Sequence, residues 1–432
     1  MRPNAPFGLV MGLALLSGLL TFLFREVIFM RLFVLMAALL LLSAAWTGIS
    51  LRGVELSRTA RATRLRVGQY AEQRFALVNR GRLPHFGLEV RDESPLSSLG
   101  SEQGSRYLTR LGGGQRRSYS VRVTLRRRGV FPLGPTLLLG GDPFGLFSMR
   151  RAFPSRQSVI VYPYLVRLEN FVPTRGQMTG GRMVPRRALY ITPFPAGARQ
   201  YLPGDPYNRI HWKATAHSGR LMSKEFEQDP QSDVWLFLDA GSGSHYAPPP
   251  SDKGPETESL RGVRAWLPKD SLEYAVSVAA TLAEYYLRHG EAVGLATAAP
   301  RPEVILPAHG TLQLARVLEA LASAQRGDSI SMTALVEEQV GLIPQGGLVL
   351  VVGGRLTRDL WESTQRLLDN QLSPLLVLAD MASFGAEEQP AEDLPQPETL
   401  GVPVLRLSYG TELKPTLEEQ ARRLFPADLR RG

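Results

Sequence analysis

Two long apolar runs dominate the start of the chain. The first extends over residues 7–24 and the second over residues 32–48, and a short charged segment, 25–31, links them. A helix needs roughly 17 to 25 apolar residues to cross a bilayer, so each run is long enough to span one. A cleaved signal peptide is the alternative for the first run, but no small-residue cleavage site ends it and a second apolar run follows. Residues 1–50 are therefore predicted to form a transmembrane helical hairpin.

Basic residues are distributed unevenly around this hairpin. Two lie in the link, Arg25 and Arg31, and a larger group follows the second run: Arg52, Arg58, Arg61, Arg64 and Arg66. Basic flanks of membrane helices stay on the cytoplasmic side. The pattern predicts a two-pass membrane protein with both termini and the large soluble region in the cytoplasm.

After the hairpin the hydrophobic pattern changes to a period of two. Tyr119, Val121, Val123 and Leu125 alternate with polar residues, which is typical of a strand with one buried face. Similar short runs occur at 73–79, 87–91, 136–139 and 158–162, with turn-rich pieces between them. Several short strands without an intervening helical pattern predict an antiparallel β-sandwich over residues 51–168.

In residues 231–432, strand patterns alternate with helical ones. A buried strand at 233–239 ends in Asp239, and a helix is expected at 270–289, where Asp270 and Glu273 have the spacing of a capping box. Further strands are predicted at 292–296, 304–306, 348–352 and 375–378, and further helices at 311–325, 357–371 and 416–424. This order predicts an α/β domain with a doubly wound, mostly parallel sheet, so the whole chain is a multidomain α+β protein.

Composition narrows the classes of function. The chain has 432 residues, a net charge of +10 and no cysteine, which excludes disulfides, thiolate metal sites and cysteine nucleophiles. A basic excess suits nucleic acid or anionic lipid. No zinc finger, helix-turn-helix or stacking-aromatic motif accompanies the charge, so a lipid bilayer is the expected partner and nucleic acid is not.

Between the two soluble domains, residues 169–230 are predicted to hold a linker and a dense signature stretch at 199–227. Pro203 and Gly204 predict a type II turn, after which Asp205 and Arg209 are close enough to pair. Apolar anchors are available at Tyr201, Ile210 and Trp212. One interpretation is a structural latch between the two domains. The alternative is an active site built from Asp205, His211, Lys213 and His217.

The same stretch resembles the signature of the bacterial family known as domain of unknown function 58. That signature reads Arg-x-Tyr-x-Pro-Gly-Asp, then Arg-x-Ile-x-Trp, a run of small residues and Leu-x-x-Lys-Glu. The matching positions are Arg199, Tyr201, Pro203, Gly204, Asp205, Arg209, Ile210, Trp212, Ala214, Ala216, Leu221, Lys224 and Glu225. His217 departs from the family, which has Arg there, and residues 128–135 and 142–147 resemble upstream pieces of it. The predicted interaction residues are Arg199, Tyr201, Pro203, Gly204, Asp205, Arg209, Ile210, Trp212, Lys213, Lys224 and Glu225. The resemblance implies a bacterial inner membrane and pairing with an AAA+ ATPase of the MoxR type.

The second soluble half also resembles a von Willebrand factor A domain, in which Asp-x-Ser-x-Ser after the first strand holds a divalent metal. Here Asp239 is followed by Ala-Gly-Ser-Gly-Ser, so Gly241 and Gly243 occupy the hydroxyl positions, and 351–354 lacks the second acid. Hard cations need several oxygen ligands, so Asp239 is predicted to be a degenerate site without metal, and no cofactor is expected. The polar, Pro-rich insertion 241–268 is predicted to be disordered.

Common catalytic motifs are missing from the sequence. It contains no P-loop, HExxH, Gly-x-Ser-x-Gly or GxGxxG opening a helix. The leading hypothesis is a membrane-anchored cytoplasmic interaction or adaptor protein, not an enzyme, that works with a MoxR-type ATPase in the assembly or maturation of other proteins. The alternative is an envelope-related enzyme that uses Asp205, His211 and Lys213.

Overall fold

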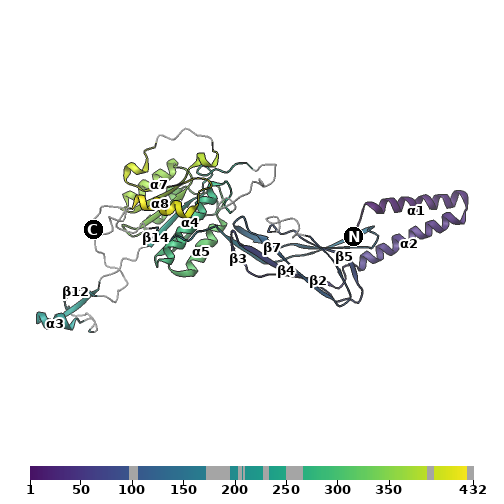
Figure 1. Ribbon diagram of the computed structural model, residues 1–432, viewed down its shortest axis with the longest axis horizontal. Helices are drawn as coiled ribbons and strands as arrows, with labels where there is room; N and C mark the ends of the chain where they lie inside the picture. Colours follow the sequence, from purple (N-terminus) through teal and green to yellow (C-terminus); the bar gives the residue numbers. More distant parts are fainter. Residues whose placement is uncertain are drawn as a thin grey trace. The chain divides into compact units, whose positions relative to one another are not determined.

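The computed structural model describes residues 1–96, 106–171, 195–202, 207, 210–226, 233–249, 266–386 and 394–425, without the side chains at 106, 108, 195–199 and 224–226 (Figure 1). The chain divides into two compact units. The first, called the β unit below, contains Met1–Tyr164 and two short later segments, Ala265–Leu267 and Leu321–Ser323. The second contains a small signature module at 195–226 and an α/β sheet domain.

The β unit begins with two apolar helices, α1 (Ala5–Phe24) and α2 (Val27–Ile49). Both are long and apolar enough to cross a membrane, and few of their side chains are buried. The link between them is shorter than the predicted 25–31, because α2 already begins at Val27 and includes Arg31. Residues 27–31 contain no helix breaker, and a continuous helix satisfies its own backbone hydrogen bonds in an apolar environment.

Eleven strands form the rest of the described β unit, in three sheets with the orders β1-β10-β9-β5-β6, β2-β4-β7 and β3-β11-β8. Every described pair is antiparallel except β3 with β11. The strands are β1 (Arg2–Pro3), β2 (Val54–Ala60), β3 (Arg64–Arg66), β4 (Tyr70–Asn79), β5 (His85–Asp92), β6 (Arg106–Leu111), β7 (Arg116–Thr124), β8 (Gly129–Pro132), β9 (Thr136–Gly141), β10 (Phe147–Phe153) and β11 (Ser158–Tyr162).

Two of these sheets share one apolar core. Val54, Phe75 and Leu77 from β2 and β4 pack with Leu88 and Leu138 from β5 and β9. An aromatic stack crosses the same space, with the Tyr119 ring of β7 centred 3.9 Å from Tyr107 of β6 and 5.1 Å from Phe75. The alternation of apolar and polar residues therefore correctly identified antiparallel strands with one buried face.

The core of the β unit also contains a buried ion pair that the sequence did not reveal. The Arg58 guanidinium donates to both carboxylate oxygens of Asp92, at 2.9 and 2.7 Å, and the two side chains are 6% and 8% exposed. Arg58 also lies 5.0 Å from the Phe75 ring centroid and contacts Gln73. Burial lowers the pKa of Arg58, while the charge of Asp92 opposes that shift. Arg58 is thus part of the core rather than a free surface charge beside the membrane.

The signature module consists of β12 (Pro195–Gln200), α3 (Trp212–Ser218) and β13 (Met222–Phe226), with β12 and β13 antiparallel. The Met222 peptide joins α3 to the sheet, because its N–H donates to the Thr215 hydroxyl and its carbonyl accepts from the His211 N–H. Ile210 is 4% exposed and bridges to Ser223. These contacts hold α3 against a two-stranded antiparallel sheet.

The α/β domain is built on one six-stranded sheet with the order β16-β15-β14-β17-β18-β19. All its described pairs are parallel except β15 with β16. Its strands are β14 (Asp233–Asp239), β15 (Ala292–Ala298), β16 (Glu303–Ala308), β17 (Leu348–Gly353), β18 (Ser373–Ala379) and β19 (Val404–Leu407). Its helices are α4 (Ser271–Arg288), α5 (Gly310–Ser323), α6 (Met332–Val340), α7 (Arg358–Asp369) and α8 (Leu413–Leu424), with short 3₁₀ turns η5 (Met381–Phe384) and η6 (Pro397–Leu400).

The core of this domain lies on both faces of the sheet. Trp235 and Phe237 pack with Met332 and Val336 of α6 and Leu360 of α7 on one face of the sheet, while α4 contacts β14, β15, β17 and β18. Asp270 caps α4 as predicted, since its carboxylate accepts from the Leu272 N–H at 2.9 Å. The predictions missed α6 and β19, which are too short for their periodicity to distinguish them from loop.

Candidate functional site

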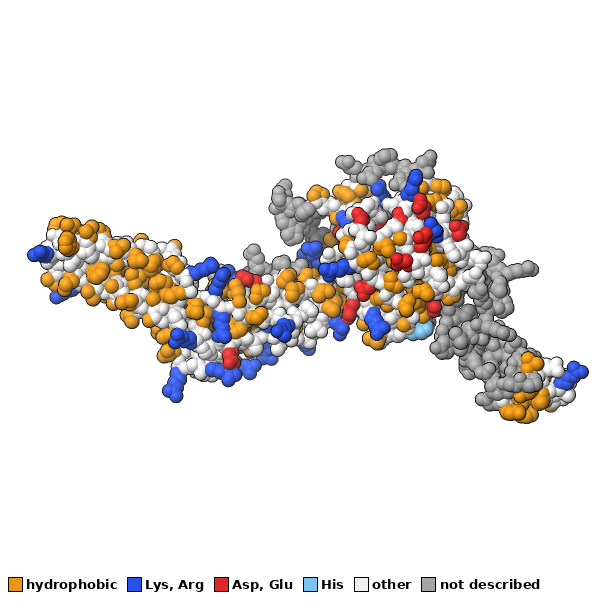
Figure 2. All heavy atoms as spheres, turned by 180° about the vertical axis from the view of Figure 1, so that it is seen from behind, with side chains coloured by type: hydrophobic (Ala, Val, Ile, Leu, Met, Phe, Trp, Pro, Cys, Tyr) orange, Lys and Arg blue, Asp and Glu red, His pale blue; other side chains and the backbone are white. Residues whose placement is uncertain are grey.

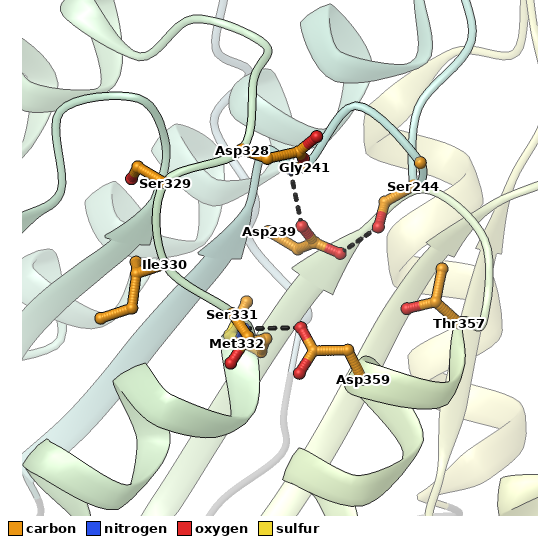
Figure 3. Close-up of a pocket in the computed structure, with 11 residues that line it drawn as sticks. Asp239, Gly241, Ser244, Asp328, Ser329, Ile330, Ser331, Met332, Thr357 and Asp359 are labelled. Atoms are coloured by element: carbon orange, nitrogen blue, oxygen red, sulfur yellow. Dashed lines mark hydrogen bonds between the residues drawn. The ribbon is translucent and has the colours of Figure 1, made fainter.

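The pocket of interest lies in the α/β domain beyond the carboxyl end of β14, where parallel sheets commonly bind ligands. It is an open hollow of about 530 Å³. Three segments contribute its lining, which consists of Asp239, Gly241, Gly243, Ser244, Asp328, Ser329, Ile330, Ser331, Met332, Thr357 and Asp359. Figure 3 shows carboxylates entering it from three different segments.

Asp239, the last residue of β14, organises the loop that follows it. Its Oδ1 accepts from the Gly241 N–H at 2.8 Å, and its Oδ2 accepts from the Ser244 hydroxyl at 2.5 Å (Figure 3). Ser244, one residue out of register with the metal-binding pattern, therefore binds the Asp239 carboxylate directly. Residues 241–249 and 266–268 of the insertion predicted to be disordered are ordered in the structure, and residues 250–265 lie outside the described residues.

The other two carboxylates of the pocket also hold backbone segments. Asp328 accepts from both the N–H and the hydroxyl of Ser242, and these bonds lower its pKa. Asp359 accepts from the N–H groups of Met332 and Thr333 at 2.6 and 3.0 Å, so it caps the start of α6 from the neighbouring helix α7. Among the residues that the structure describes, no group of three or more His, Cys, Asp or Glu is placed to hold a metal. The metal-free site at Asp239 stays a prediction.

Gly354 makes room for the loop after β14. A Cβ atom at this position would lie 1.6 Å from the Ser244 carbonyl oxygen, whereas at Gly353 the nearest atom would be 3.5 Å away. The Arg355 N–H donates to the same Ser244 carbonyl at 2.9 Å. Gly354, which follows β17 in the stretch 351–354 that lacks the second acid, thus lets the two loops pack together.

His245 is a buried group of this site that sequence reasoning missed. Its Nε2 lies 2.7 Å from the Asp239 carbonyl oxygen and its Nδ1 lies 3.1 Å from the Ser271 hydroxyl, at the start of α4. The carbonyl can only accept, so Nε2 carries the proton and Nδ1 accepts from Ser271. Burial lowers the pKa of His245 despite the opposing effect of Asp239, and the imidazole is neutral.

We expect the stability of the α/β domain to fall with acidity through His245. The unfolded imidazole takes up a proton near pH 6.5, whereas the folded state resists it, so stability is fully present above that pH and decreases below it. The negative charges of Asp239 and Asp270 raise the pKa of His245, and the positive charge of Arg326 lowers it. These three groups are the charged neighbours that act on its protonation. Thermal unfolding measured from about pH 8 to 5 should lose part of its pH dependence in His245→Asn.

The exposed His309, on the same domain, provides the control for this measurement. The substitution His309→Asn measures the effect of removing an imidazole from an exposed position. An identical profile for His245→Asn and the unmodified chain would contradict the role of His245.

The predicted signature residues are only partly described. Pro203, Gly204, Asp205 and Arg209 lie outside the described residues, as do the side chains of Arg199, Lys224 and Glu225. The predicted pairing of Asp205 with Arg209 and the convergence of Asp205 with His211 and Lys213 therefore remain predictions.

The described signature residues differ sharply in burial. Ile210 is buried within the module, whereas Trp212 is 67% exposed on it. The burial of Trp212 against one of the two domains stays a prediction. Only one face of the seven-residue α3 can contact the two-stranded sheet, and Ala214 and Thr215 occupy that face. His211 caps α3, since its Nδ1 accepts from the Ala214 N–H at 3.2 Å, and Lys213 is exposed.

The module and the pocket fall within one range of sequence similarity. Residues 197–378 match the family described as protein of unknown function DUF58. The DUF58 range begins in β12, ends in β18 and contains every residue that lines the pocket. The chain is also similar to the uncharacterized protein YeaD of Bacillus subtilis (strain 168), with 26% identity over 76% of this chain and 75% of that protein.

Solved structures resemble this chain only weakly. The CARDB domain of the PF1109 protein from Pyrococcus furiosus, crystallised with di-metal ions, covers 25% of this chain and 91% of its own length at a TM-score of 0.19 and 13% identity. A β-glucosidase from Listeria innocua covers 26% of this chain and 16% of its own, at a TM-score of 0.17 and 11% identity. Neither similarity carries an argument about function.

Proposed function

We propose that this protein is a membrane-anchored cytoplasmic adaptor that binds another protein through its signature module. The observation that carries the proposal is the surface of the module, where large apolar side chains are exposed beside basic ones. Tyr207 is 80% exposed, Trp212 67%, Leu202 60% and Leu221 47%. Exposed aromatic residues of this kind are typical of the energetic centres of protein interfaces.

Membrane attachment is supported by α1 and α2, whose apolar side chains cover them in Figure 2. We place the soluble region in the cytoplasm, at a bacterial inner membrane, on the basis of the arginines after α2. Arg52, Arg61, Arg64 and Arg66 are exposed, although Arg58 is buried with Asp92. Basic residues close to a membrane helix favour this orientation.

A von Willebrand factor A-like fold is our interpretation of the α/β domain. Its mostly parallel sheet, with the antiparallel strand β16 at one edge, supports that interpretation. In this fold the pocket at Asp239 lies at the usual ligand edge. Since its three carboxylates already hold loops and a helix terminus, we propose that they shape a binding surface instead of catalysing a reaction.

The proposed partner is an AAA+ ATPase of the MoxR type, and the proposed role is assembly or maturation of other proteins. The support is the resemblance of the signature stretch to a family whose members are commonly paired with such ATPases. The envelope-related enzyme that would use Asp205, His211 and Lys213 gains no support from the described part of the module, where His211 caps α3 and Lys213 is exposed.

Replacement of two exposed aromatics should weaken capture of the ATPase. We expect Tyr207→Ala with Trp212→Ala to lower recovery of a MoxR-type ATPase by about tenfold or more, because interface aromatics often contribute over 1 kcal/mol each. The measurement is affinity purification of the tagged full chain from solubilised membranes, with quantitative mass spectrometry of that ATPase.

Leu312→Ala is the matched control, because Leu312 is equally exposed, at 67%, but lies on α5 of the α/β domain. It should leave ATPase recovery unchanged. Equal recovery with the aromatic double variant, or no ATPase bound to the unmodified chain, would refute the proposed partner surface.

A further inference from the structure

The strands and loops of the β unit hold both ends of the α1–α2 hairpin firmly. At the start of α1, the Asn4 side chain donates to the Gly145 carbonyl at 2.9 Å and accepts from the Ser148 hydroxyl at 2.9 Å. The Phe7 ring of α1 lies 5.1 Å from the Phe147 ring. At the end of α2, Leu51 enters the apolar core of the β sheets. The membrane boundary is therefore fixed relative to this end of the β unit.

A rigid loop next to Asn4 presents an aromatic side chain to the outside. Asp142 is buried and its two carboxylate oxygens accept from the N–H groups of Phe144 and Phe147, at 2.9 and 2.6 Å. Gly145 adopts a φ of 71°, which suits glycine and turns the chain back. Phe144, at the tip, is 62% exposed. This loop is anchored on both sides, so it presents Phe144 in a defined direction beside the start of α1.

Three neighbouring loops complete this end of the unit. The buried side chain of Asn79 joins two of them, because it donates to the carbonyls of Leu83 and Gly112. The N–H of the next residue, Arg80, donates to the Gly53 carbonyl and so joins the third. Two more large apolar side chains are exposed here, Leu83 at 52% and Phe86 at 41%. Exposed apolar side chains next to the ends of apolar helices suit contact with the interface of a bilayer.

The charge of the same loops is strongly positive. In residues 51–55, 80–86, 110–117 and 142–147 the exposed arginines are Arg52, Arg80, Arg82, Arg110, Arg116 and Arg117. The acids in these ranges are Glu55, which pairs with Arg80 at 2.9 Å, and Asp142, whose oxygens are occupied as above. Figure 2 shows Lys and Arg side chains gathered where the β unit meets the helices. Arginines in this position suit the anionic headgroups of a bilayer.

We propose that this end of the β unit is a lipid-contacting foot. Phe144, Leu83 and Phe86 enter the headgroup region of the bilayer that α1 and α2 cross, and the surrounding arginines bind anionic lipid headgroups. Trp46, in the last turn of α2, lies at the level where interfacial tryptophans are common. The foot would hold the β unit in one orientation on the membrane. It rests on the proposed membrane anchoring and adds a second, peripheral contact to it.

The absence of cysteine makes a direct test possible. The full chain with Phe144→Cys, labelled with nitrobenzoxadiazole and reconstituted in phosphatidylcholine vesicles containing phosphatidylglycerol, should show blue-shifted emission and strong quenching by headgroup nitroxide lipids. A residue in the interface lies roughly 5 to 10 Å deep, within reach of such quenchers. Leu83→Cys is a second probe of the same foot, in case the Phe144 site tolerates labelling poorly.

Tyr70→Cys is the matched control, because Tyr70 is 64% exposed at the opposite end of β4. Nine residues separate it from Asn79, about 30 Å along the strand, so its probe should remain in water. Omitting phosphatidylglycerol, or changing Arg82→Glu with Arg117→Glu, should weaken quenching at position 144.

The outcomes separate the foot from the anchor. If the protein floats with the vesicles but the probes at 144 and 83 are as water-exposed as the one at 70, the foot is refuted and the anchor stands. If the protein does not float with the vesicles at all, the anchoring fails and the foot with it. Quenching that ignores lipid charge and the arginine substitutions would refute the role of the arginines.

Discussion

Asp92→Ala is expected to destabilise the β unit by about 3 to 5 kcal/mol, the usual cost of leaving one partner of a buried ion pair alone. Without Asp92, the Arg58 guanidinium would remain inside a core where its side chain is only 6% exposed. The hydroxyls of Ser94 and Thr136 also contact Arg58, but neither carries the charge that compensates it. Hydrogen exchange of β2 and β4 peptides in the detergent-solubilised chain, measured with increasing urea, reports this loss.

Two further variants serve as controls for Asp92→Ala. Arg61→Ala breaks an exposed pair with Glu72, in which Arg61 is 81% exposed, and should change stability little, because water screens such pairs. Arg58→Met with Asp92→Leu removes both charges and should recover most of the stability, since apolar replacements of a buried pair are often neutral. If Asp92→Ala behaves like Arg61→Ala, the pair does not support the core.

Gly354→Ala should displace the loop after β14 and lower the stability of the α/β domain by about 1 to 3 kcal/mol, as overpacking of a tight contact does. The added Cβ would lie 1.6 Å from the Ser244 carbonyl oxygen and 3.0 Å from His245 Nδ1. Both contacts are to buried groups that cannot simply rotate away. Residues 241–245 must therefore move, which breaks the hydrogen bonds of Ser244 and His245 to Asp239.

Gly353→Ala is the control for this effect. Its Cβ would meet only ordinary contacts, at 3.5 Å from Asp239 and Leu360, so it should change stability little. Thermal unfolding and hydrogen exchange of peptides from 241–249 distinguish the two variants. Similar protection in both would show that the loop does not depend on Gly354.

Elements whose signal is local were predicted well from the sequence. The apolar helices, the strand Asp233–Asp239 and the capped helix α4 each carry their own periodicity or capping residue, so neighbours in the chain suffice to define them. The short elements α6 and β19 were not predicted, because their stability comes from burial in the sheet domain and not from a local pattern. The apolar character of Trp212 says nothing about which face of the seven-residue α3 meets the sheet of the module, and there Trp212 is exposed.

The candidate site combines a residue that the sequence identified with others that only the three-dimensional structure brought beside it. Asp239 was recognised because it ends a buried strand, and the sequence alone determined the two long apolar helices, the strand-rich half and the strand-and-helix half. Only the tertiary structure brought Asp328 and Asp359 beside it, placed the Ser244 hydroxyl on its carboxylate, and made Gly354 the space into which that loop packs. The same is true of Arg58 and Asp92, which are 34 residues apart. Hydrophobic periodicity encodes which face of an element is buried, whereas hydrogen bonds and close contacts between distant segments depend on how the elements meet in three dimensions.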